Sequence, residues 1–146
     1  LVQVISSDVD ISQLIRNEEA GKTASVIAAI GYVRDVLMEI QMGFAKKPGL
    51  VADGRDMGTV VFPNAKFKVF LDASAEERAN RRVKQLQSKG EDAIISRILA
   101  DIEERDHRDR SRKVSPLRAA EDAVVIDTSF MSIEEVLLQV EKLVEN

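Results

Sequence analysis

Residues 67–90, FKVFLDASAEERANRRVKQLQSKG, contain the pattern that decides the fold of this chain. The apolar run Phe67–Leu71, interrupted only by one lysine, is typical of a buried strand. Ser74 follows, three residues before Glu77, and this spacing is a capping box that opens a helix. Gly90 suits the end of that helix. The stretch therefore predicts one strand followed directly by one capped helix.

The same pattern recurs toward the C-terminus. Residues 123–126 are apolar, and Ser132 with Glu135 repeats the capping box. The positions expected to be buried in the helix that follows are Val136, Leu137, Val140 and Leu143. Residues 50–52 form a further short apolar segment, which we interpret as a third strand of this kind. Short apolar strands that alternate with helices predict an α/β fold, with a parallel sheet flanked by helices.

Three other segments are predicted from local signals. Residues 1–5 are interpreted as a strand. A helical region begins near Asn17, is interrupted at Gly31 and stops at 46–49, KKPG. Its apolar face is expected to contain Val33, Val36, Leu37, Ile40 and Phe44. Another helix is expected to begin near residues 91–92, to end before Pro116 and to bury a stripe made of Ile94, Ile95, Ile98, Leu99 and Ile102.

Composition limits the class of protein. With 146 residues, 45% apolar and 32% charged, the chain suits one globular domain and not a disordered segment. It has no cysteine and no apolar run of ~18 residues, which excludes disulfides and predicts no membrane span, so we expect a cytoplasmic protein. The net charge of −4 argues against a general nucleic-acid binder. The most cationic stretch, 105–113, suggests a small anionic ligand instead.

That cationic stretch contains an ordered stripe. If the helix persists, Asp109 lies ~40° around the helix axis from Arg105. Arg112 lies ~20° from Arg105 in the opposite direction. Two forked guanidiniums suit a phosphate, and one carboxylate suits a pair of sugar hydroxyls. The alternative is a solvated face with ordinary i, i+4 salt bridges, which the residues alone favour. The same alternative applies to Arg78 and Arg82.

The loop Asp53-Gly54-Arg55-Asp56 connects two apolar segments, and its residues fit two interpretations equally well. Its glycine makes a surface turn plausible, while a ligand-binding loop at the end of a strand uses the same residue types. Arg55 can donate to anions and Asp56 can accept from amino groups. Asp53 has no assigned role. His107, within the arginine-rich run, is predicted to be a surface residue.

Residues 51–63 (VADGRDMGTVVFP), 67–90 and 102–117 (IEERDHRDRSRKVSPL) closely resemble bacterial cytidylate kinases, the (d)CMP kinases of the nucleoside monophosphate kinase group. The resemblance implies a P-loop kinase-like α/β fold and a mobile lid. It also implies transfer of the γ-phosphoryl group of ATP to CMP or dCMP with Mg²⁺. It implies an intact enzyme that is monomeric and that binds neither a nucleic-acid polymer nor a membrane.

The resemblance also assigns roles to single residues. Ser25 and Asp56 correspond to residues that hydrogen-bond the cytosine amino group, and Arg34 corresponds to the arginine that reads the ring nitrogen and carbonyl. By the same resemblance, Arg55, Arg105 and Arg112 correspond to catalytic arginines that contact the monophosphate, and Asp109 corresponds to the acid that contacts the sugar hydroxyls. Arg78 and Arg82 correspond to arginines that close over the ATP phosphates.

The family's P-loop has no counterpart in this sequence, which contains no G-x-x-x-x-G-K-[ST] motif. Gly21-Lys22-Thr23 resembles only the tail of that motif and is interpreted as a coincidence. We therefore expect a C-terminal portion of a cytidylate kinase whose P-loop strand and helix, with most of the ATP and Mg²⁺ contacts, lie outside this chain. Such a portion is expected to be inactive alone and able to self-associate.

The expected organisation is a remnant of a β-rich CMP-binding insert at 1–16, a helical region at 17–48 and an α/β core at 49–146, with a short lid near 86–95. An alternative function is a non-catalytic nucleotide-binding or interaction module. An RNA-binding helix at 105–118 is a third hypothesis, which the acidic net charge and the 4% aromatic content disfavour.

Overall fold

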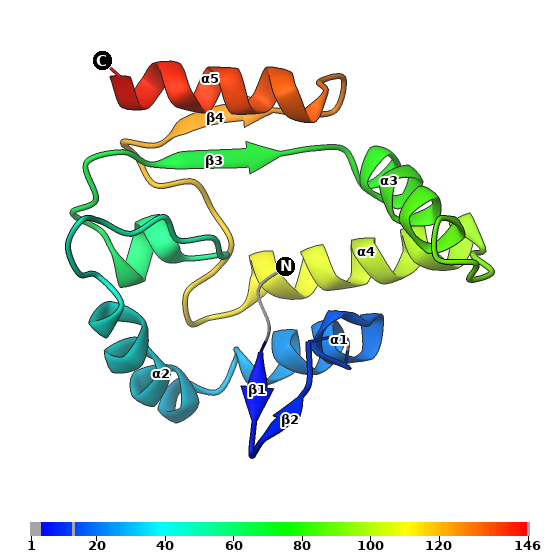
Figure 1. The fold of residues 1–146 in the computed structure, drawn as a ribbon, viewed down its shortest axis with the longest axis horizontal. Coiled ribbons are helices and arrows are strands. Elements are labelled where there is room, and N and C mark those ends of the chain that lie inside the picture. The colour runs from blue at the N-terminus through cyan, green and yellow to red at the C-terminus, as the bar shows by residue number, and fades with distance from the viewer. Residues whose placement is uncertain (1–3, 13, 146) are drawn as a thin grey trace.

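The computed structural model describes residues 4–12 and 14–145 of this α/β chain (Figure 1). Along the chain the elements are β1 (Ile5–Ser6), β2 (Val9–Asp10), the 3₁₀-helix η1 (Leu14–Arg16), α1 (Glu18–Ile27), α2 (Gly31–Gly43), the π-helix η2 (Met57–Val61), β3 (Val69–Asp72), α3 (Ala75–Gln87), α4 (Ile95–Ser111), β4 (Val124–Asp127) and α5 (Ile133–Glu145).

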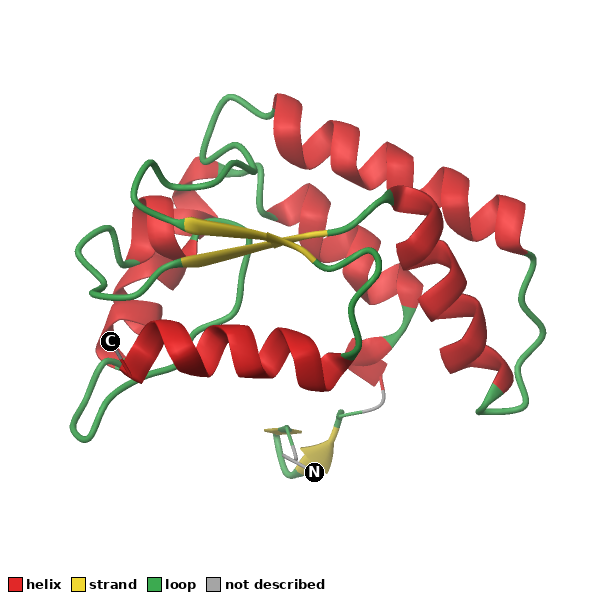
Figure 2. Ribbon diagram, turned by 90° about the horizontal axis from the view of Figure 1, so that it is seen from above, coloured by secondary structure: helices red, strands yellow, loops and turns green. Residues whose placement is uncertain are grey.

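A small parallel sheet of β3 and β4 lies among the helices (Figure 2). The two strands are in register from Val69 opposite Val124 to Asp72 opposite Asp127, and in Figure 1 they run between α5 and α4. This arrangement confirms the predicted parallel pairing, with each strand displaced by one or two residues from its predicted bounds.

Of the other two predicted strands, one is wrong and one lies partly outside the described residues. The predicted strand at 50–52 is wrong: these residues belong to no strand, and Val51 is 100% exposed. An apolar run becomes a strand only when another strand satisfies its backbone, and no described strand pairs with this segment. The first three residues of the strand predicted over 1–5 lie outside the described residues. Ile5 belongs to β1, which pairs antiparallel with β2.

The two capping boxes differ. At α5 both halves form: Glu135 N donates to Ser132 Oγ over 3.2 Å, and Ser132 N donates to Glu135 Oε2 over 2.7 Å. At α3 only the first half forms, because Glu77 N donates to Ser74 Oγ over 3.1 Å, but Ser74 N donates to Ser129 Oγ over 3.0 Å. The start of α3 is therefore attached to the segment that follows β4.

The helix breaks at Gly31 and Gly90 agree with the sequence. Helix α2 begins at Gly31, and Gly90 has a φ of 76°, a conformation that favours glycine. The start predicted near residues 91–92 is wrong, since α4 begins at Ile95. The backbone carbonyl of Ile94 accepts the first helical hydrogen bonds, and no side chain caps this end, so acidic residues upstream do not fix the boundary.

The apolar faces of α2 and α5 are more open than their patterns predict. No described residue of either helix is buried, and the exposed fractions are 48% at Val36, 54% at Ile40 and 55% at Leu137. In the predicted stripe of α4, Ile94 lies outside the helix and Ile95 is 48% exposed. A pattern selects the face that could be buried, but burial requires a covering element. The described part of the chain covers these faces only in part, since Val33, Val136, Val140 and Leu143 are half-buried. No described helix is both long and apolar enough to cross a membrane.

Candidate functional site

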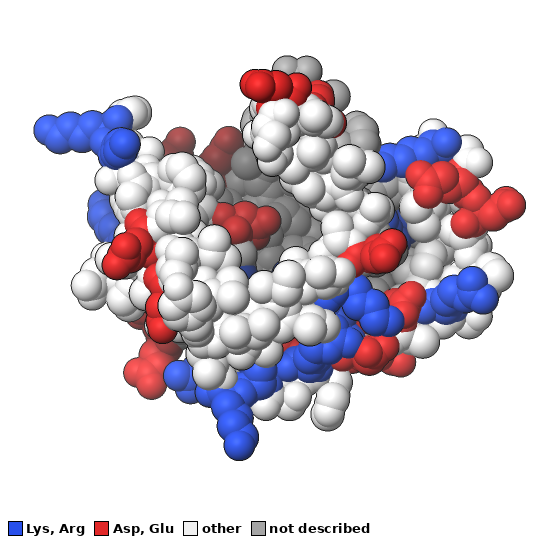
Figure 3. Space-filling view, turned by 90° about the horizontal axis from the view of Figure 1, so that it is seen from below, with Lys and Arg blue, Asp and Glu red and all other residues white. Residues whose placement is uncertain are grey.

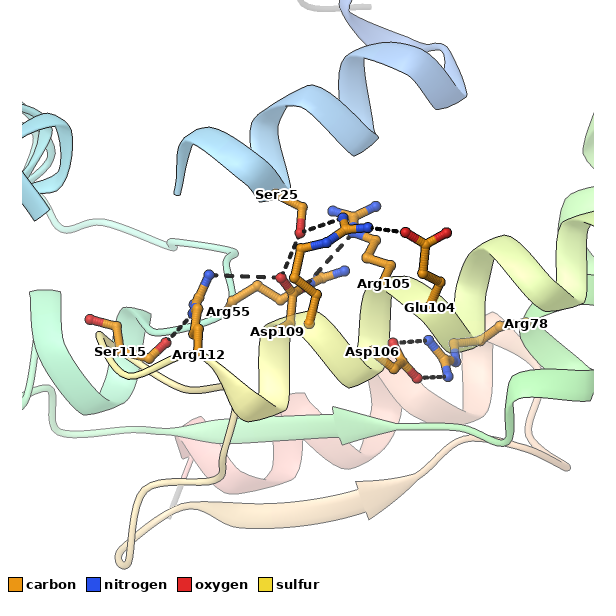
Figure 4. Close-up of polar contacts among 10 residues, drawn as sticks. Ser25, Arg55, Arg78, Glu104, Arg105, Asp106, Asp109, Arg112 and Ser115 are labelled. Atoms are coloured by element: carbon orange, nitrogen blue, oxygen red, sulfur yellow. Dashed lines mark hydrogen bonds and ion pairs between the residues drawn. The ribbon is translucent and has the colours of Figure 1, made fainter. Parts of the chain in front are cut away.

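Asp109 of α4 is the centre of a polar cluster and is only 1% exposed (Figure 4). Ser25 Oγ donates to Asp109 Oδ1 over 2.8 Å, and Arg55 Nε donates to Asp109 Oδ2 over 3.0 Å. Ser25 comes from α1 and Arg55 from the segment before η2. Three segments that are distant in sequence thus meet at one buried carboxylate.

Two further arginines lie near this carboxylate. Arg105 Nε is 3.8 Å from Asp109 Oδ2, and Arg112 Nη1 is 3.8 Å from Asp109 Oδ1. The prediction that Arg105, Asp109 and Arg112 lie close together is confirmed, but the helical geometry assumed for Arg112 is wrong. Helix α4 ends at Ser111, and Arg112 has an extended backbone with φ −63° and ψ 141°. Arg112 Nε donates to the carbonyl of Ser115, so the following loop holds this side chain.

The guanidinium of Arg112 has capacity left for a ligand. Its side chain is 5% exposed, and Nη2 is buried without a hydrogen-bond partner among the described residues. An unpaired buried donor is costly, and a forked guanidinium suits a phosphate or carboxylate oxygen. The cluster is therefore suited to an anion.

Arg34 and Asp56 form a second buried pair. Arg34 Nη2 donates to Asp56 Oδ2 and Arg34 Nη1 donates to the carbonyl of Ala28 over 3.3 Å; the side chains are 12% and 8% exposed. Burial lowers the pKa of the Arg34 guanidinium, and the nearby Arg112 cation lowers this pKa further, while Asp35 opposes the shift. Asp56 directly follows Arg55, which donates to Asp109, so the two polar groups are neighbours.

The backbone of Asp56 is also fixed, at the start of η2. Its carbonyl accepts the N–H of Val60 over 2.9 Å and that of Val61 over 3.3 Å, which closes the π-helical turn. Short π-helical turns often occur at functional sites. Asp56 is 7% exposed, so this part of the loop is not a solvated turn. Asp53 and Arg55 are more exposed, and Asp53 still has no assigned role.

The second predicted arginine pair lies apart from Asp109. Arg78 donates through Nη1 to Asp106 Oδ1 over 3.0 Å, through Nη2 to Asp106 Oδ2, and through Nε to the carbonyl of Ala73 over 3.1 Å (Figure 4). The hydrogen bonds that Arg78 donates to Asp106 raise the pKa of Arg78. Arg82 Nη1 donates to Gln85 Oε1 over 2.6 Å within α3. Arg81 donates hydrogen bonds to Glu77 and also to Thr128.

Sequence reasoning missed Arg108. Arg108 Nη1 donates to Ser25 Oγ over 3.4 Å, and the same guanidinium pairs with Glu104. The resemblance assigns Ser25 to the amino group of the base, and in the structure its hydroxyl contacts Asp109 and Arg108. The position of Arg108 in the RDHRDR run was the one available signal. His107 is exposed, as predicted, and Gly21-Lys22-Thr23 lies inside α1, where it forms no phosphate loop.

The described residues contain no group of three acidic, histidine or cysteine side chains that could hold a metal ion. On the face drawn in Figure 3, acidic and basic side chains are interspersed. This mixture agrees with a local anion site better than with a long cationic track for a polymer.

Fold and site together define an α/β protein with a buried, arginine-lined site suited to an anion. The family model for cytidylate kinase matches residues 2–146. The chain belongs to the cytidylate kinase family.

Curated relatives agree with this assignment. Cytidylate kinase of Photobacterium profundum is 60% identical over 139 residues, which cover 95% of this chain and 61% of the relative. That of Aliivibrio salmonicida is 56% identical over 146 residues, covering 100% and 65%. Cytidylate kinase 1 of Haemophilus influenzae is 54% identical over 138 residues, covering 94% and 60%. The chain thus spans 60% to 65% of the length of these three relatives.

Proposed function

We propose that the whole protein transfers the γ-phosphoryl group of ATP to CMP or dCMP, and that this chain supplies the CMP site. The observation that carries the proposal is the buried unpartnered Nη2 of Arg112, which lies within a cluster of arginines around Asp109. The neighbouring Arg34–Asp56 pair offers donors and an acceptor for a base at the same site. Membership of the family adds support.

In this proposal Arg55, Arg105 and Arg112 bind the monophosphate of CMP. Phosphoryl transfer depends chiefly on alignment and on positive charge around the moving group, and converging guanidiniums supply both. Without ligand, Asp109 acts as the counter-ion of these arginines. A bound phosphate takes over part of this pairing and leaves the carboxylate able to accept from sugar hydroxyls.

The base is read by the Arg34–Asp56 pair. Ionised Asp56 accepts from the amino group of cytosine, whereas the carbonyl of uracil at that position would leave two acceptors facing each other. Such a mismatch typically costs ~1–3 kcal/mol. The hydrogen bond from Ser25 to the amino group of the base remains part of the proposal. In the structure Ser25 Oγ donates to Asp109, the residue proposed to contact the sugar hydroxyls.

Asp56→Ala tests base reading. The substitution should weaken binding of CMP far more than binding of UMP, because only CMP offers the amino group that Asp56 accepts. Chemical-shift titrations with each nucleotide, followed in ¹⁵N-labelled protein, measure the two affinities even when binding is weak. Equal losses for CMP and UMP would refute this role of Asp56.

We further propose that ATP and Mg²⁺ bind mainly to a P-loop strand and helix in the remainder of the protein, with Arg78 and Arg82 closing over the phosphates. Two observations support this division. The chain spans less than two thirds of the length of these relatives. A groove of about 1370 Å³ lies beside β3, between the 50–73 segment and α5, and its lining combines apolar residues with charged ones that include Asp72, Arg78 and Asp106. In this proposal, further elements of the whole protein pack into this groove beside the two-stranded sheet.

The ATP proposal has a direct test. The purified 146-residue chain should bind CMP weakly and produce no CDP from CMP and ATP, because it contains no P-loop motif. A coupled assay for ADP release measures this, and robust turnover would refute the division. Reading the coding sequence upstream of residue 1 distinguishes a kinase from a non-catalytic nucleotide-binding module. The insert, helical, core and lid boundaries and the cytoplasmic location remain predictions within this proposal.

A further inference from the structure

Lys68 is a buried cation that the proposed reaction does not use. Its side chain is 7% exposed, and its Nζ donates to the carbonyl of Pro63 and to Asp122 Oδ2 over 2.6 Å. The Asp122 side chain is 66% exposed. Burying an ammonium group is unfavourable unless its partners compensate, so this lysine is held in place by specific contacts.

The stem of Lys68 passes along η2. A Cβ atom added at Gly58 would lie 3.4 Å from Lys68 Cδ and 3.5 Å from Cγ, so the backbone of η2 lies against this stem. The ammonium group then reaches Pro63, two residues beyond the end of η2. Lys68 therefore contacts both the π-helical turn and the residues that directly follow it.

Lys68 itself is attached to the sheet. It directly precedes β3, and its carbonyl accepts the backbone N–H of Val124 at the start of β4 over 2.9 Å. The contacts of its side chain thus connect η2 to the most regular part of the fold. The other end of η2 is held by a second contact, the pair formed by Arg34 and Asp56.

We propose that Lys68 is a positioning residue that sets the place of Asp56 and so contributes to the choice between cytosine and uracil. Asp56, η2 and Pro63 form a continuous short unit, because the carbonyl of Asp56 closes the π-helical turn. Arg34 holds the start of this unit and Lys68 holds its end. The inference rests on the proposed function, in which Asp56 accepts from the amino group of the base.

Lys68→Met keeps the apolar stem and removes the charge and the donor. The ratio of CMP affinity to UMP affinity should fall about fivefold, the equivalent of one net hydrogen bond. CMP and UMP share sugar and phosphate, so a purely structural loss weakens both equally and leaves the ratio unchanged. Lys68→Arg, which retains a cationic donor, should preserve most of the ratio.

Two matched variants control for charge and for folding. Lys66→Met removes a neighbouring exposed lysine, whose Nζ lies 4.5 Å from the Phe67 ring centroid, and should leave the ratio unchanged. Asp122→Asn alters only the exposed ion-pair partner of Lys68. This variant should fold even if Lys68→Met does not. It should lower the ratio by about twofold, as expected for one exposed ion pair.

Combining Lys68→Met with Asp56→Ala separates the possible failures. In the Asp56→Ala background, Lys68→Met should not change the ratio further. An unchanged ratio for Asp122→Asn, equal losses for both nucleotides in Lys68→Met, or the same fall in Lys66→Met overturns the role of Lys68. If Asp56→Ala leaves the ratio unchanged, or the unmodified chain binds neither nucleotide at millimolar concentration, the proposed base site is itself wrong and the inference falls with it.

Discussion

The Asp109 cluster and the α5 region show opposite relations between residue type and burial. Asp109 is 1% exposed with cations around it, whereas Phe130 and Ile133, at the start of the α5 region, are 99% and 84% exposed. Among the described residues, the buried apolar ones are Val61, Ala79 and Ile126, and the buried polar ones are Ser12, Ser25, Asp56, Asp109, Thr128 and Ser129. More polar than apolar residues are therefore buried in the described part of the chain, and the two charged ones, Asp56 and Asp109, are both paired with arginines.

The largest effect is expected at Asp109. Asp109→Asn removes the negative charge shared by three arginines, and breaking such a buried ion pair costs about 3–5 kcal/mol. Urea denaturation measures the free energy of unfolding. Inorganic phosphate should stabilise the variant more than the original chain, because it replaces the missing counter-ion.

Asp101→Asn provides the control for this experiment. Asp101 lies on the same helix, its side chain is 47% exposed, and its ion pair with Lys22 is 3.9 Å long, so its loss should cost less than ~1 kcal/mol. Equal effects of the two substitutions would show that the buried cluster does not hold the fold together.

A smaller effect is expected from the apolar side of the comparison. Ile126 of β4 is 5% exposed, and Ile126→Ala should destabilise the fold by about 2–4 kcal/mol through lost burial and the cavity that remains. Leu137 of α5 is 55% exposed, and Leu137→Ala should change stability by ~0.5 kcal/mol or less. Thermal unfolding of both variants measures the difference. A large loss at Leu137 would show that α5 is packed more tightly in solution.

The smallest effect concerns Asp127, at the carboxyl end of β4. The hydroxyl of Ser129 donates to Asp127 Oδ1 over 2.6 Å and its backbone N–H over 2.9 Å, and these bonds lower the pKa of the carboxyl group. Because the folded pKa is depressed, this contribution to stability is present above the unfolded pKa and is lost as the pH falls through the folded pKa. Ser129→Ala should therefore raise the pKa of Asp127 toward its ordinary value.

A ¹³C NMR titration of the Asp127 carboxyl group measures this pKa, and Ser129→Thr is the matched control that keeps the hydroxyl. The rise should be partial, since the backbone N–H of residue 129 remains in place. An identical pKa in all three proteins would mean that the hydroxyl does not act on this carboxylate.

Local signals in the sequence predicted the regular elements well where neighbouring residues decide them. The Ser132–Glu135 box is complete, since both partners lie in the same helical turn. The Ser74–Glu77 box is incomplete because Ser129, far along the chain, provides an acceptor for Ser74 N. Residues 50–52 had the right composition for a strand but found no described partner.

The candidate site divides in the same way. The grouping of Arg105 with Asp109 follows from one helical turn and was predicted from spacing alone. The contact of Ser25 with Asp109 spans 84 residues, and that of Arg34 with Asp56 spans 22. No periodicity reports such distances, and only the resemblance to a family placed these residues in one site.

The sequence by itself determined the identity of the family, the order of elements from β3 to α5 and the residue types that can bind an anion. Local backbone preferences and side-chain chemistry are properties of short segments, so a short motif is enough to specify them. Only the tertiary structure decided which carboxylate the arginines share, that Arg112 keeps a buried donor, and that Lys68 reaches Pro63. Such contacts depend on how distant segments pack together, and packing free energy is a property of the whole fold.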